Sequence, residues 1–397
     1  MSSKTRIRMP NTPFLDAVRK SGLLTPDDLI GVLSRYEPEE IEATDPIHLA
    51  TYLVRKKLLT KFQAMQLLNG RTGGFLLGRY KVLEGLRQDR VGMVFLAEHM
   101  DTGEKAFVKV LPSERASDVE AFAAFMDEVK VASRINLKAA ARILETGVLN
   151  GTHYVVTEHV PAPTMDKVLE KNGPVSPGVA ALIAAQVALA LQHAHAAGLL
   201  HRDIKPQNIA LFPDRRVKLI DLGLTNFIDD PFKSKTKRIN LKEYADEVAH
   251  IPPEQAWGAE LDARSDLYSL GSTLYALLTG GPAFAGFAPQ AMQARQTQDI
   301  PAPSDVRPDI PEPLDNLIQK LGKRDPEERF QKASEVIATV YPWLPPAEWE
   351  ALGVPQPRPT MKRPVIKPPS KPALEEEEAV PVKSGGLFGW VKRLFGG

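Results

Sequence analysis

The sequence predicts an α+β fold of two lobes, preceded by a small all-α domain. Between residues 78 and 111 the apolar residues fall in short, β-rich runs, whereas from Ser176 onward they recur at helical spacing over long stretches. A β-rich half followed by a helical half is typical of a two-lobed α+β domain. Before residue 78, the apolar residues follow helical spacing alone.

The composition fits a folded chain of more than one domain. The 397 residues, 43% of them hydrophobic, allow two or three domains. The 50 Lys and Arg residues nearly balance the 49 Asp and Glu residues, so no long-range field would hold the chain on nucleic acid or an anionic membrane. Basic residues also do not alternate with aromatic ones as in nucleic-acid readers. We therefore expect no nucleic-acid partner.

Three further features bear on location. Cysteine is absent, which excludes disulfides and thiolate metal sites and agrees with a reducing cytoplasm. Residues 1–20 are polar and basic, without the apolar stretch of a secretory signal. The longest apolar stretch, 179–191, is too short to cross a bilayer and is expected to be a buried helix. The sequence thus favours a cytoplasmic protein.

Residues 1–76 are expected to form the all-α domain, with helices at 14–24, 29–33, 47–59 and 62–68. Thr25 with Asp28, and Thr60 with Gln63, have the spacing of capping boxes at helix starts. Residues 23–25 are also repeated at 58–60. Two interpretations stay open: two helical hairpins that form an adaptor for a partner protein, or a helical extension that caps the next domain.

Residues 77–344 are expected to hold both lobes, the N-lobe at 77–160 and the C-lobe at 161–344. Period-2 patterns predict strands at 80–86, 93–98, 105–111, 141–148 and 152–158. Helical spacing predicts helices at 119–135, 178–197, 266–278, 313–321 and 333–340.

Two short segments close the chain. Residues 345–384 contain ten prolines and a run of four glutamates, a composition that predicts a disordered linker. Residues 385–397 place apolar side chains on one helical face, with Lys392 and Arg393 opposite. We expect residues 386–395 to dock on a membrane surface or in a partner's groove, or else to fold back on the preceding domain.

The sharpest motif is His-Arg-Asp-Ile-Lys-Pro-Gln-Asn at 201–208, followed thirteen residues later by an Asp-Leu-Gly turn that begins at Asp221. Asn208 and Asp221 offer the hard oxygen donors that suit Mg²⁺. Asp203 can orient an attacking hydroxyl and accept its proton, and Lys205 can neutralise charge on a moving phosphoryl group. These are the groups that phosphoryl transfer from a triphosphate needs.

Together these motifs resemble the catalytic loop and the metal-binding turn of protein kinases. The resemblance covers residues 78–343 and points to bacterial, eukaryotic-like (Hanks-type) serine/threonine kinases, several of which carry an N-terminal helical extension. It implies the two-lobed protein kinase fold, with ATP and Mg²⁺ as cofactors. It also implies transfer of the γ-phosphoryl group to serine or threonine of protein substrates in signalling.

The resemblance also assigns roles to individual residues. Lys109 would hold the α- and β-phosphates, and Glu128 would pair with that lysine. Asp266 would anchor the backbone of the catalytic loop, and Arg329 would pair with Glu254. The implied ATP site consists of Gly92, Val94, Lys109, Glu128, Glu158, Val160 and Ala210.

The sequence departs from the family at the nucleotide. Arg87 and Asp89 stand where the phosphate-covering loop usually has glycine, which lets backbone N–H groups approach phosphates closely. Phe107 replaces the alanine above the adenine, and Ala210 replaces the leucine common below it. Either adenine binds displaced downward, or Phe107 fills its site.

One departure lies at the end of the activation segment, where Glu247 replaces a threonine. The substitutions leave an alternative function open, that of a pseudokinase: a scaffold or binding module with weak or no ATP turnover.

Overall fold

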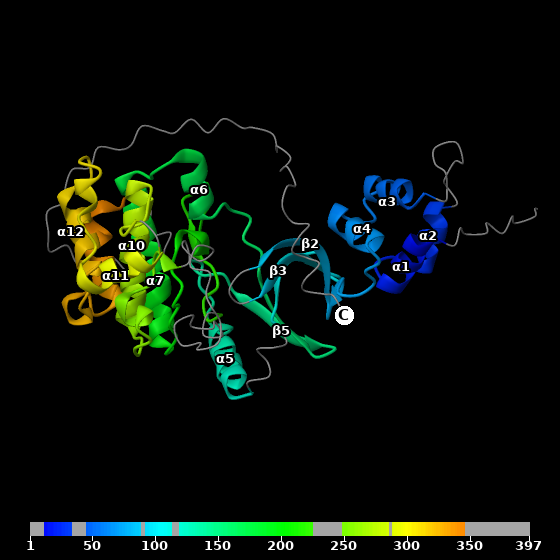
Figure 1. Ribbon diagram of the computed structural model, residues 1–397, viewed down its shortest axis with the longest axis horizontal. Helices are drawn as coiled ribbons and strands as arrows, with labels where there is room; N and C mark the ends of the chain where they lie inside the picture. Colours follow the sequence, from blue (N-terminus) through cyan, green and yellow to red (C-terminus); the bar gives the residue numbers. More distant parts are fainter. Residues whose placement is uncertain are drawn as a thin grey trace, which may run out of the picture. The chain divides into compact units, whose positions relative to one another are not determined.

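The structure is a computed structural model that describes residues 12–33, 45–88, 92–112, 119–224, 248–285 and 288–345. Its first elements are four helices, α1 (Pro13–Ser21), α2 (Pro26–Leu33), α3 (Pro46–Arg55) and α4 (Lys61–Leu68). They form the helical unit seen in blue in Figure 1. The expected Asp89, Glu247 and residues 346–397 lie outside the described residues.

The helix ends of this unit follow local chemistry. Helix α1 stops at Ser21 rather than at the expected residue 24, because Gly22 turns into the left-handed region with φ 71°. Helix α3 stops at Arg55 rather than at 59, and Lys57 adopts a φ of 59°. Both predicted capping boxes are confirmed, at Thr25 and at Thr60.

The helical unit has an apolar core of its own. Side chains from all four helices, among them Leu15, Leu29, Leu53 and Leu67, are almost completely buried together with Phe75, which follows α4. Helix α4 also contacts the sheet of the N-lobe. The unit is therefore a packed helical body whose helix α4 contacts the next domain, as the capping interpretation expected.

The N-lobe is a six-stranded antiparallel sheet in the order β1-β2-β3-β4-β6-β5. Its strands are β1 (Leu76–Leu77), β2 (Tyr80–Gln88), β3 (Met93–His99), β4 (Lys105–Val110), β5 (Ile143–Leu149) and β6 (Thr152–Glu158). The five predicted strands are confirmed, with ends that shift by at most two residues. Strand β1 was not predicted, because two residues carry no periodicity.

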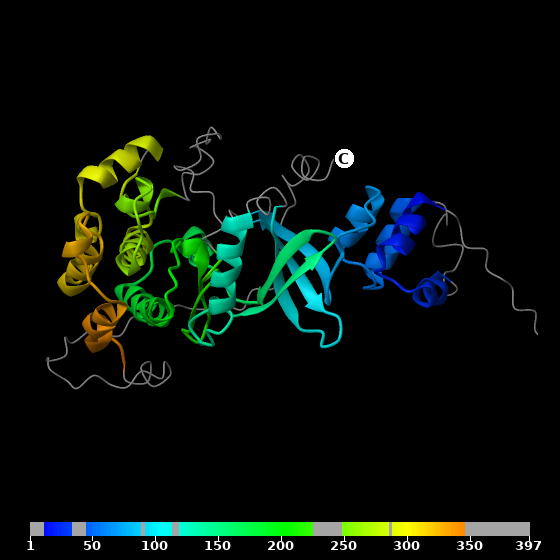
Figure 2. The ribbon, with the colours of Figure 1, turned by 90° about the horizontal axis from the view of Figure 1, so that it is seen from below.

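Helix α5 (Val119–Ala132) runs beside the sheet in both Figure 1 and Figure 2. Its Phe125 and Val129 are buried in the same apolar cluster as Val155 of β6. The helix ends at Ala132 rather than at the predicted residue 135. Packing against β6 fixes the helix face that carries Glu128 relative to the sheet.

The C-lobe is helical. It contains α6 (Met165–Asn172), α7 (Pro177–Ala196), α9 (Pro253–Ala256), α10 (Ala263–Thr279), α11 (Ala288–Thr297), α12 (Glu312–Leu321) and α13 (Ala333–Val340). Short 3₁₀ turns lie between them at Pro206–Asn208, Pro303–Asp305, Pro326–Glu328 and Tyr341–Trp343. A two-stranded antiparallel hairpin, β7 (Ile209–Leu211) with β8 (Val217–Leu219), completes the lobe.

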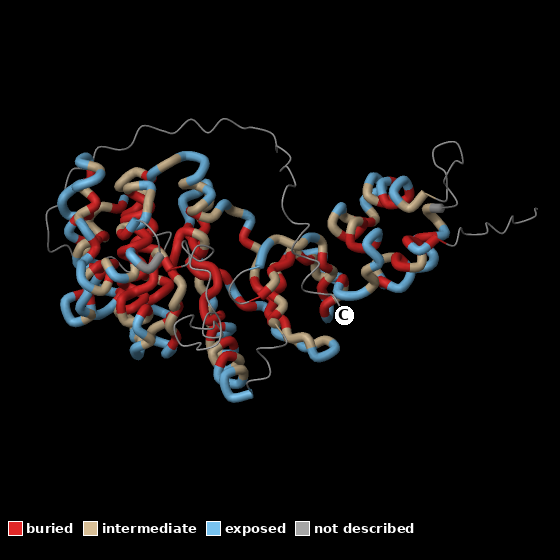
Figure 3. Tube along the Cα trace, viewed as in Figure 1, coloured by how far each residue is buried: buried red, intermediate tan, exposed pale blue. Residues whose placement is uncertain are grey.

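Helix α7 is the core of the C-lobe. Most of its residues are buried, as are those of α10, which the red stretches in Figure 3 make visible. Among the described residues it is also the one helix long and apolar enough to cross a membrane. Its burial among α10 and α13 explains the apolar composition, as the sequence predicted.

Candidate active site

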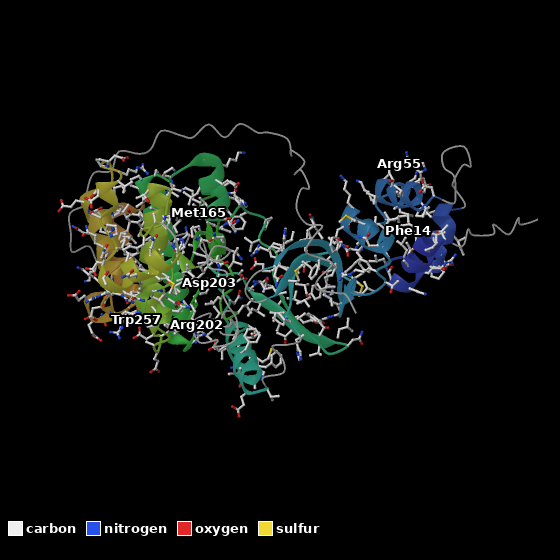
Figure 4. All side chains as sticks on the ribbon, viewed as in Figure 1. Phe14, Arg55, Met165, Arg202, Asp203 and Trp257 are labelled. Atoms are coloured by element: carbon white, nitrogen blue, oxygen red, sulfur yellow. The ribbon has the colours of Figure 1, made fainter. Side chains whose placement is uncertain are left out.

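The catalytic loop brings three of the predicted side chains together. Asn208 Nδ2 donates to Asp203 Oδ2 at 2.9 Å and to the Asp203 carbonyl oxygen at 2.8 Å. Lys205 Nζ lies 3.0 Å from the same Oδ2. The loop belongs to the C-lobe segment between α7 and β7, where Figure 4 labels Asp203 and Arg202. The carboxylate is thus held by an amide and an ammonium group, both contributed by its own loop.

The backbone of this loop is held from beneath by Asp266 of α10. Its Oδ2 accepts from the His201 backbone N–H and its Oδ1 from the Arg202 backbone N–H, both at 2.8 Å. Burial alone would raise the pKa of Asp266, but the hydrogen bond with His195, the electrostatic interactions with His195 and His201 and the backbone N–H of His201 lower the pKa below its usual range. Asp266 therefore stays ionised and fixes the loop, as the resemblance implied.

His195 is a positioning residue that the sequence did not reveal. Its Nε2 lies 2.8 Å from Asp266 Oδ2. In the sequence it is one of two histidines on an apolar helix, and only the fold shows that it faces α10. A histidine that faces a buried carboxylate could not be distinguished from a surface histidine by spacing.

A second anchor follows the activation segment. Arg329 Nη1 and Nη2 donate to the two carboxylate oxygens of Glu254 at 2.7 and 2.9 Å, and the arginine side chain is completely buried. Ser265 Oγ also donates to Glu254, at 2.7 Å. The pair that the resemblance implied is confirmed. A bidentate, buried pair of this kind is geometrically demanding and fixes α9 against the 3₁₀ turn at Pro326–Glu328.

The β7-β8 hairpin sets Asn208 beside Asp221. Ile209 pairs with Leu219, so the residues just outside the hairpin meet at its open end, where the Ile220 N–H donates to the Asn208 carbonyl oxygen at 2.8 Å. Asp221 itself has a φ of 68°. A non-glycine residue in that region is strained, and such strain is concentrated at functional sites.

Asp221 joins the two lobes through Lys109 of β4. Lys109 Nζ donates to Asp221 Oδ2 at 2.6 Å, with only 2% and 7% of the two side chains exposed. The other carboxylate oxygen, Oδ1, is buried and has no hydrogen-bond partner among the described residues. An orphaned carboxylate oxygen is costly unless something occupies it. A divalent cation is suited to that place.

The donor set fits Mg²⁺ held jointly with a triphosphate. The described residues contain no cluster of three or more His, Cys, Asp or Glu side chains that could bind a metal alone. Asn208 and Asp221 offer one amide oxygen and one carboxylate, and Mg²⁺ commonly binds one or two protein oxygens together with phosphates and water. These two residues would hold the ion, as the sequence predicted.

Glu128 of α5 reaches into the same region, with Arg202 as its partner. Arg202 Nη1 and Nη2 donate to the two carboxylate oxygens at 2.8 and 3.1 Å. Glu128 thus forms an ion pair with Arg202, and Lys109, the partner that the resemblance implied for Glu128, forms one with Asp221. The contact between Glu128 and Arg202 was not predicted, because the charge type of a helix glutamate permits several partners and only the fold decides which lie near it.

The residues expected around adenine pack together. Val160 and Ala210 are buried in one apolar cluster with Ala141 and Ile220, and Phe107 packs against it. The Phe107 ring also meets His159 edge-on, with 5.0 Å between ring centroids. The phenyl group thus lies against the residues that would line the base, which is the volume exchange expected from the sequence.

Glu158 has a further partner in the C-lobe. Its carboxylate accepts a hydrogen bond from Lys218 of β8, and Arg142 Nε lies 3.6 Å away. This contact was not predicted. It ties the end of β6 to the hairpin that carries Asn208 and Asp221 at its open end.

Gly92 directly precedes β3, and Val94 is the second residue of that strand. A Cβ atom at Gly92 would collide with the Val110 carbonyl oxygen, so only glycine fits there. Val94 is buried and lies between Arg87 and Lys109 in the sheet register. Gly92 therefore has a packing role at the end of β4 in addition to the phosphate role that the resemblance implied.

Comparison with known proteins identifies the family. A family model described as protein kinase domain matches residues 80–342. The chain belongs to the protein kinase family. The match coincides with the two lobes and leaves the helical unit outside the kinase domain.

Several relatives are named serine/threonine kinases. PknB of Mycolicibacterium smegmatis is 33% identical over 268 residues, which cover 66% of this chain and 42% of that protein. A probable serine/threonine-protein kinase of Clostridium perfringens is 31% identical over 267 residues, covering 67% and 38%. The kinase domain of PknI of Mycobacterium tuberculosis aligns with a TM-score of 0.53 at 26% identity, over 67% of this chain and 96% of that structure. The chain thus spans about two fifths of the length of the curated relatives it matches.

Proposed function

We propose that this protein transfers the γ-phosphoryl group of MgATP to serine or threonine side chains of protein substrates. The observation that carries the proposal is the convergence of Lys109 and Asp221 with the Asp203–Asn208 pair, although these residues come from β4, the β7-β8 hairpin and the catalytic loop. Relatives that share the kinase domain are named serine/threonine kinases.

The residues divide the work of phosphoryl transfer. Asn208 and Asp221 would hold Mg²⁺, which would neutralise charge on the triphosphate. Asp203 is oriented by Asn208 and Lys205, so its carboxylate can accept the proton of an incoming hydroxyl group. Lys205, beside that carboxylate, can interact with the phosphoryl group as charge develops.

The ammonium group of Lys109 is preorganised to bind phosphate oxygens. Its ammonium group is buried and its position is fixed by Asp221, so a phosphate can join the pair without first ordering a flexible side chain. The lysine would bind the α- and β-phosphates, and Asp221 would keep one oxygen for the metal.

A direct transfer assay tests the proposal. The full chain is incubated with γ-labelled ATP, Mg²⁺ and a protein substrate, and label on serine or threonine is measured for the unmodified chain and for Asp203→Asn. Asp214→Asn is the matched control, because Asp214 is an exposed aspartate that pairs with Arg216 in the hairpin turn. Label that disappears only in Asp203→Asn supports the proposal.

The same assay separates the alternative function. A chain that transfers no label and shows no thermal shift with ATP and Mg²⁺ would be a binding module, as expected if Phe107 keeps the base out. In that case the proposed enzyme activity is wrong.

We also propose a cytoplasmic location and two docking regions. The helical unit would receive a partner protein, since Ile30 and Ile47 are 49% and 65% exposed on its surface.

Residues 386–395 would dock on a membrane surface or in a partner's groove. Co-sedimentation of the full chain with anionic vesicles, with and without residues 386–397, tests the membrane part, and equal sedimentation of both would contradict it.

A further inference from the structure

Helix α4 binds the strand that leads to the phosphate-covering loop, and the contact is made by its capping box. Thr60 Oγ1 accepts from the Gln63 N–H and donates to the Leu83 carbonyl oxygen at 2.6 Å. Gln63 Oε1 accepts from the Thr60 N–H, while its Nε2 donates to the Val82 carbonyl oxygen at 2.6 Å. Two consecutive carbonyls of β2 are therefore held by the same two side chains that begin α4.

These contacts fall on an irregularity of the sheet. Val82 pairs with Ala97, but the next pair is Glu84 with Leu96, so Leu83 is an extra residue in a β-bulge. A bulged residue is left unpaired in the ladder. Here Thr60 satisfies its carbonyl oxygen, which stabilises the bulge.

A second bulge follows under the same helix. The register shifts again between Gly85 and Arg87. A Cβ atom at Gly85 would lie 3.0 Å from Phe62 Cε2, so the missing side chain makes room for the α4 ring. Phe62 also contacts Phe95, the cross-strand partner of Gly85, with 6.3 Å between ring centroids.

The two bulges decide which residue faces the phosphates. In an unbroken ladder continued from the pair Val82–Ala97, Gly85 would lie opposite Val94. The two extra residues place Arg87 there instead, and Val94 in turn pairs with Lys109. Directly paired residues of neighbouring strands project to the same face. Arg87 therefore projects to the face on which Lys109 meets Asp221, two strands or about 10 Å away.

We propose that Arg87 is a phosphate-binding residue of this protein and that Thr60, Phe62 and Gln63 of the helical unit position it by clamping the two bulges of β2. The inference rests on the proposed function for its ligand, a nucleoside polyphosphate. Arg87 is exposed, and no carboxylate within the described ranges forms an ion pair with it. It supplies a cation where the family pattern has a glycine, which can bind phosphate only through its backbone N–H.

Arg87→Met tests the binding role. Calorimetric titration with ADP, with ATP and with adenosine, each with Mg²⁺ present, separates phosphate from base contacts. Loss of one charge-assisted contact should weaken ADP and ATP binding about tenfold or more, with adenosine affinity unchanged. Lys81→Met is the matched control, since Lys81 is at the other end of β2, paired with Glu98. Equal ADP affinity of Arg87→Met and the unmodified chain would overturn the proposal, as would an equal loss for adenosine.

The double variant Thr60→Val/Gln63→Leu tests the clamp without nucleotide. Amide hydrogen exchange in residues 82–88 should become at least tenfold faster, and ADP affinity should fall several-fold while adenosine affinity is kept. The control is Thr25→Val/Asp28→Leu, which removes the capping box of α2, whose described hydrogen bonds lie within the box and are exposed. Exchange in 82–88 that is unchanged, or equally fast in both double variants, would contradict the clamp.

The two proposals fail separately. A chain that binds ADP through Arg87 but transfers no phosphoryl group would contradict the proposed function and leave this inference standing. If the chain transfers phosphoryl groups but Arg87→Met binds ADP as tightly as the unmodified chain, only the inference about Arg87 is contradicted.

Discussion

The C-lobe side and the N-lobe side of the site follow the protein kinase pattern to different degrees. On the C-lobe side, Asp203, Asn208 and Asp221 all keep their family types, and each is held by named hydrogen bonds or ion pairs. On the N-lobe side, Arg87 and Phe107 replace smaller residues. Polar side chains that hydrogen-bond to one another tolerate few substitutions, because each loss leaves a partner unsatisfied. An apolar surface or a strand end tolerates changes of side-chain volume and charge, because the sheet itself is preserved.

The largest effect is expected at the junction of the two sides, in Lys109→Met. Asp221 would stay buried without its cation, which should lower the free energy of unfolding by about 3–5 kcal/mol and reduce phosphoryl transfer at least about 100-fold. Urea unfolding and the transfer assay measure the two effects. Lys105→Met, an exposed lysine on the same strand, should change neither.

A double variant shows whether loss of the buried Lys109–Asp221 ion pair causes the fall in stability. Lys109→Met/Asp221→Asn should recover most of the stability, because no charge is left unpaired, but no transfer activity. A single variant as stable as the unmodified chain would show that the pair does not hold the two sides together.

An intermediate effect concerns His250, a buried residue whose Nδ1 lies 3.1 Å from Ser272 Oγ of α10. Burial, with the nearby charges of Arg295 and Lys205, lowers the pKa of His250 to about 3. The His250 side chain binds a proton near pH 6.5 in the unfolded chain but not in the folded chain. The contribution of neutral His250 to the free energy of unfolding is therefore complete above pH 6.5. It is lost as the pH falls toward 3, at up to about 1.4 kcal/mol per pH unit.

His250→Gln isolates that contribution. Its stability should fall less steeply than that of the unmodified chain between pH 6.5 and 4, as measured by urea unfolding at each pH. The exposed His193→Gln is the control and should keep the original slope. Parallel curves for all three proteins would show that His250 is not the group responsible.

The smallest effect is expected on the N-lobe side, in Phe107→Ala. Removal of the ring vacates volume beside Val160 and Ala210, which a purine can occupy, so ADP should bind about three- to tenfold more tightly. Phe212→Ala removes a ring from the same cluster without touching β4 and should not tighten binding. Unchanged or weaker ADP binding by Phe107→Ala would contradict the idea that the ring competes with the base.

The sequence predicted what depends on local pattern. The caps at Thr25 and Thr60 and the five longer strands follow from spacing, and the convergence of Lys109 with Asp221 follows from the resemblance to protein kinases. The packing of Phe107 against the cluster that contains Ala210 was also expected, because the larger residue at 107 and the smaller residue at 210 both border the adenine site.

What escaped prediction depends on contacts between distant segments. The bulge at Leu83 exists where Thr60 satisfies a carbonyl that the ladder leaves unpaired, and nothing in β2 alone marks it. The pairing of Arg202 with Glu128 and the role of His195 likewise require the fold, since charge type permits several partners for each.

We expect Asp221 and Asn208 to hold a metal ion together with the nucleotide's phosphates. The most direct measurement is the ATP affinity of the unmodified chain and of Asp221→Asn, with Mg²⁺ and with Mg²⁺ removed. We predict that Mg²⁺ tightens ATP binding at least about tenfold in the unmodified chain and has little effect in Asp221→Asn. Equal Mg²⁺ dependence in both proteins, or none in the unmodified chain, would contradict a metal site at Asp221.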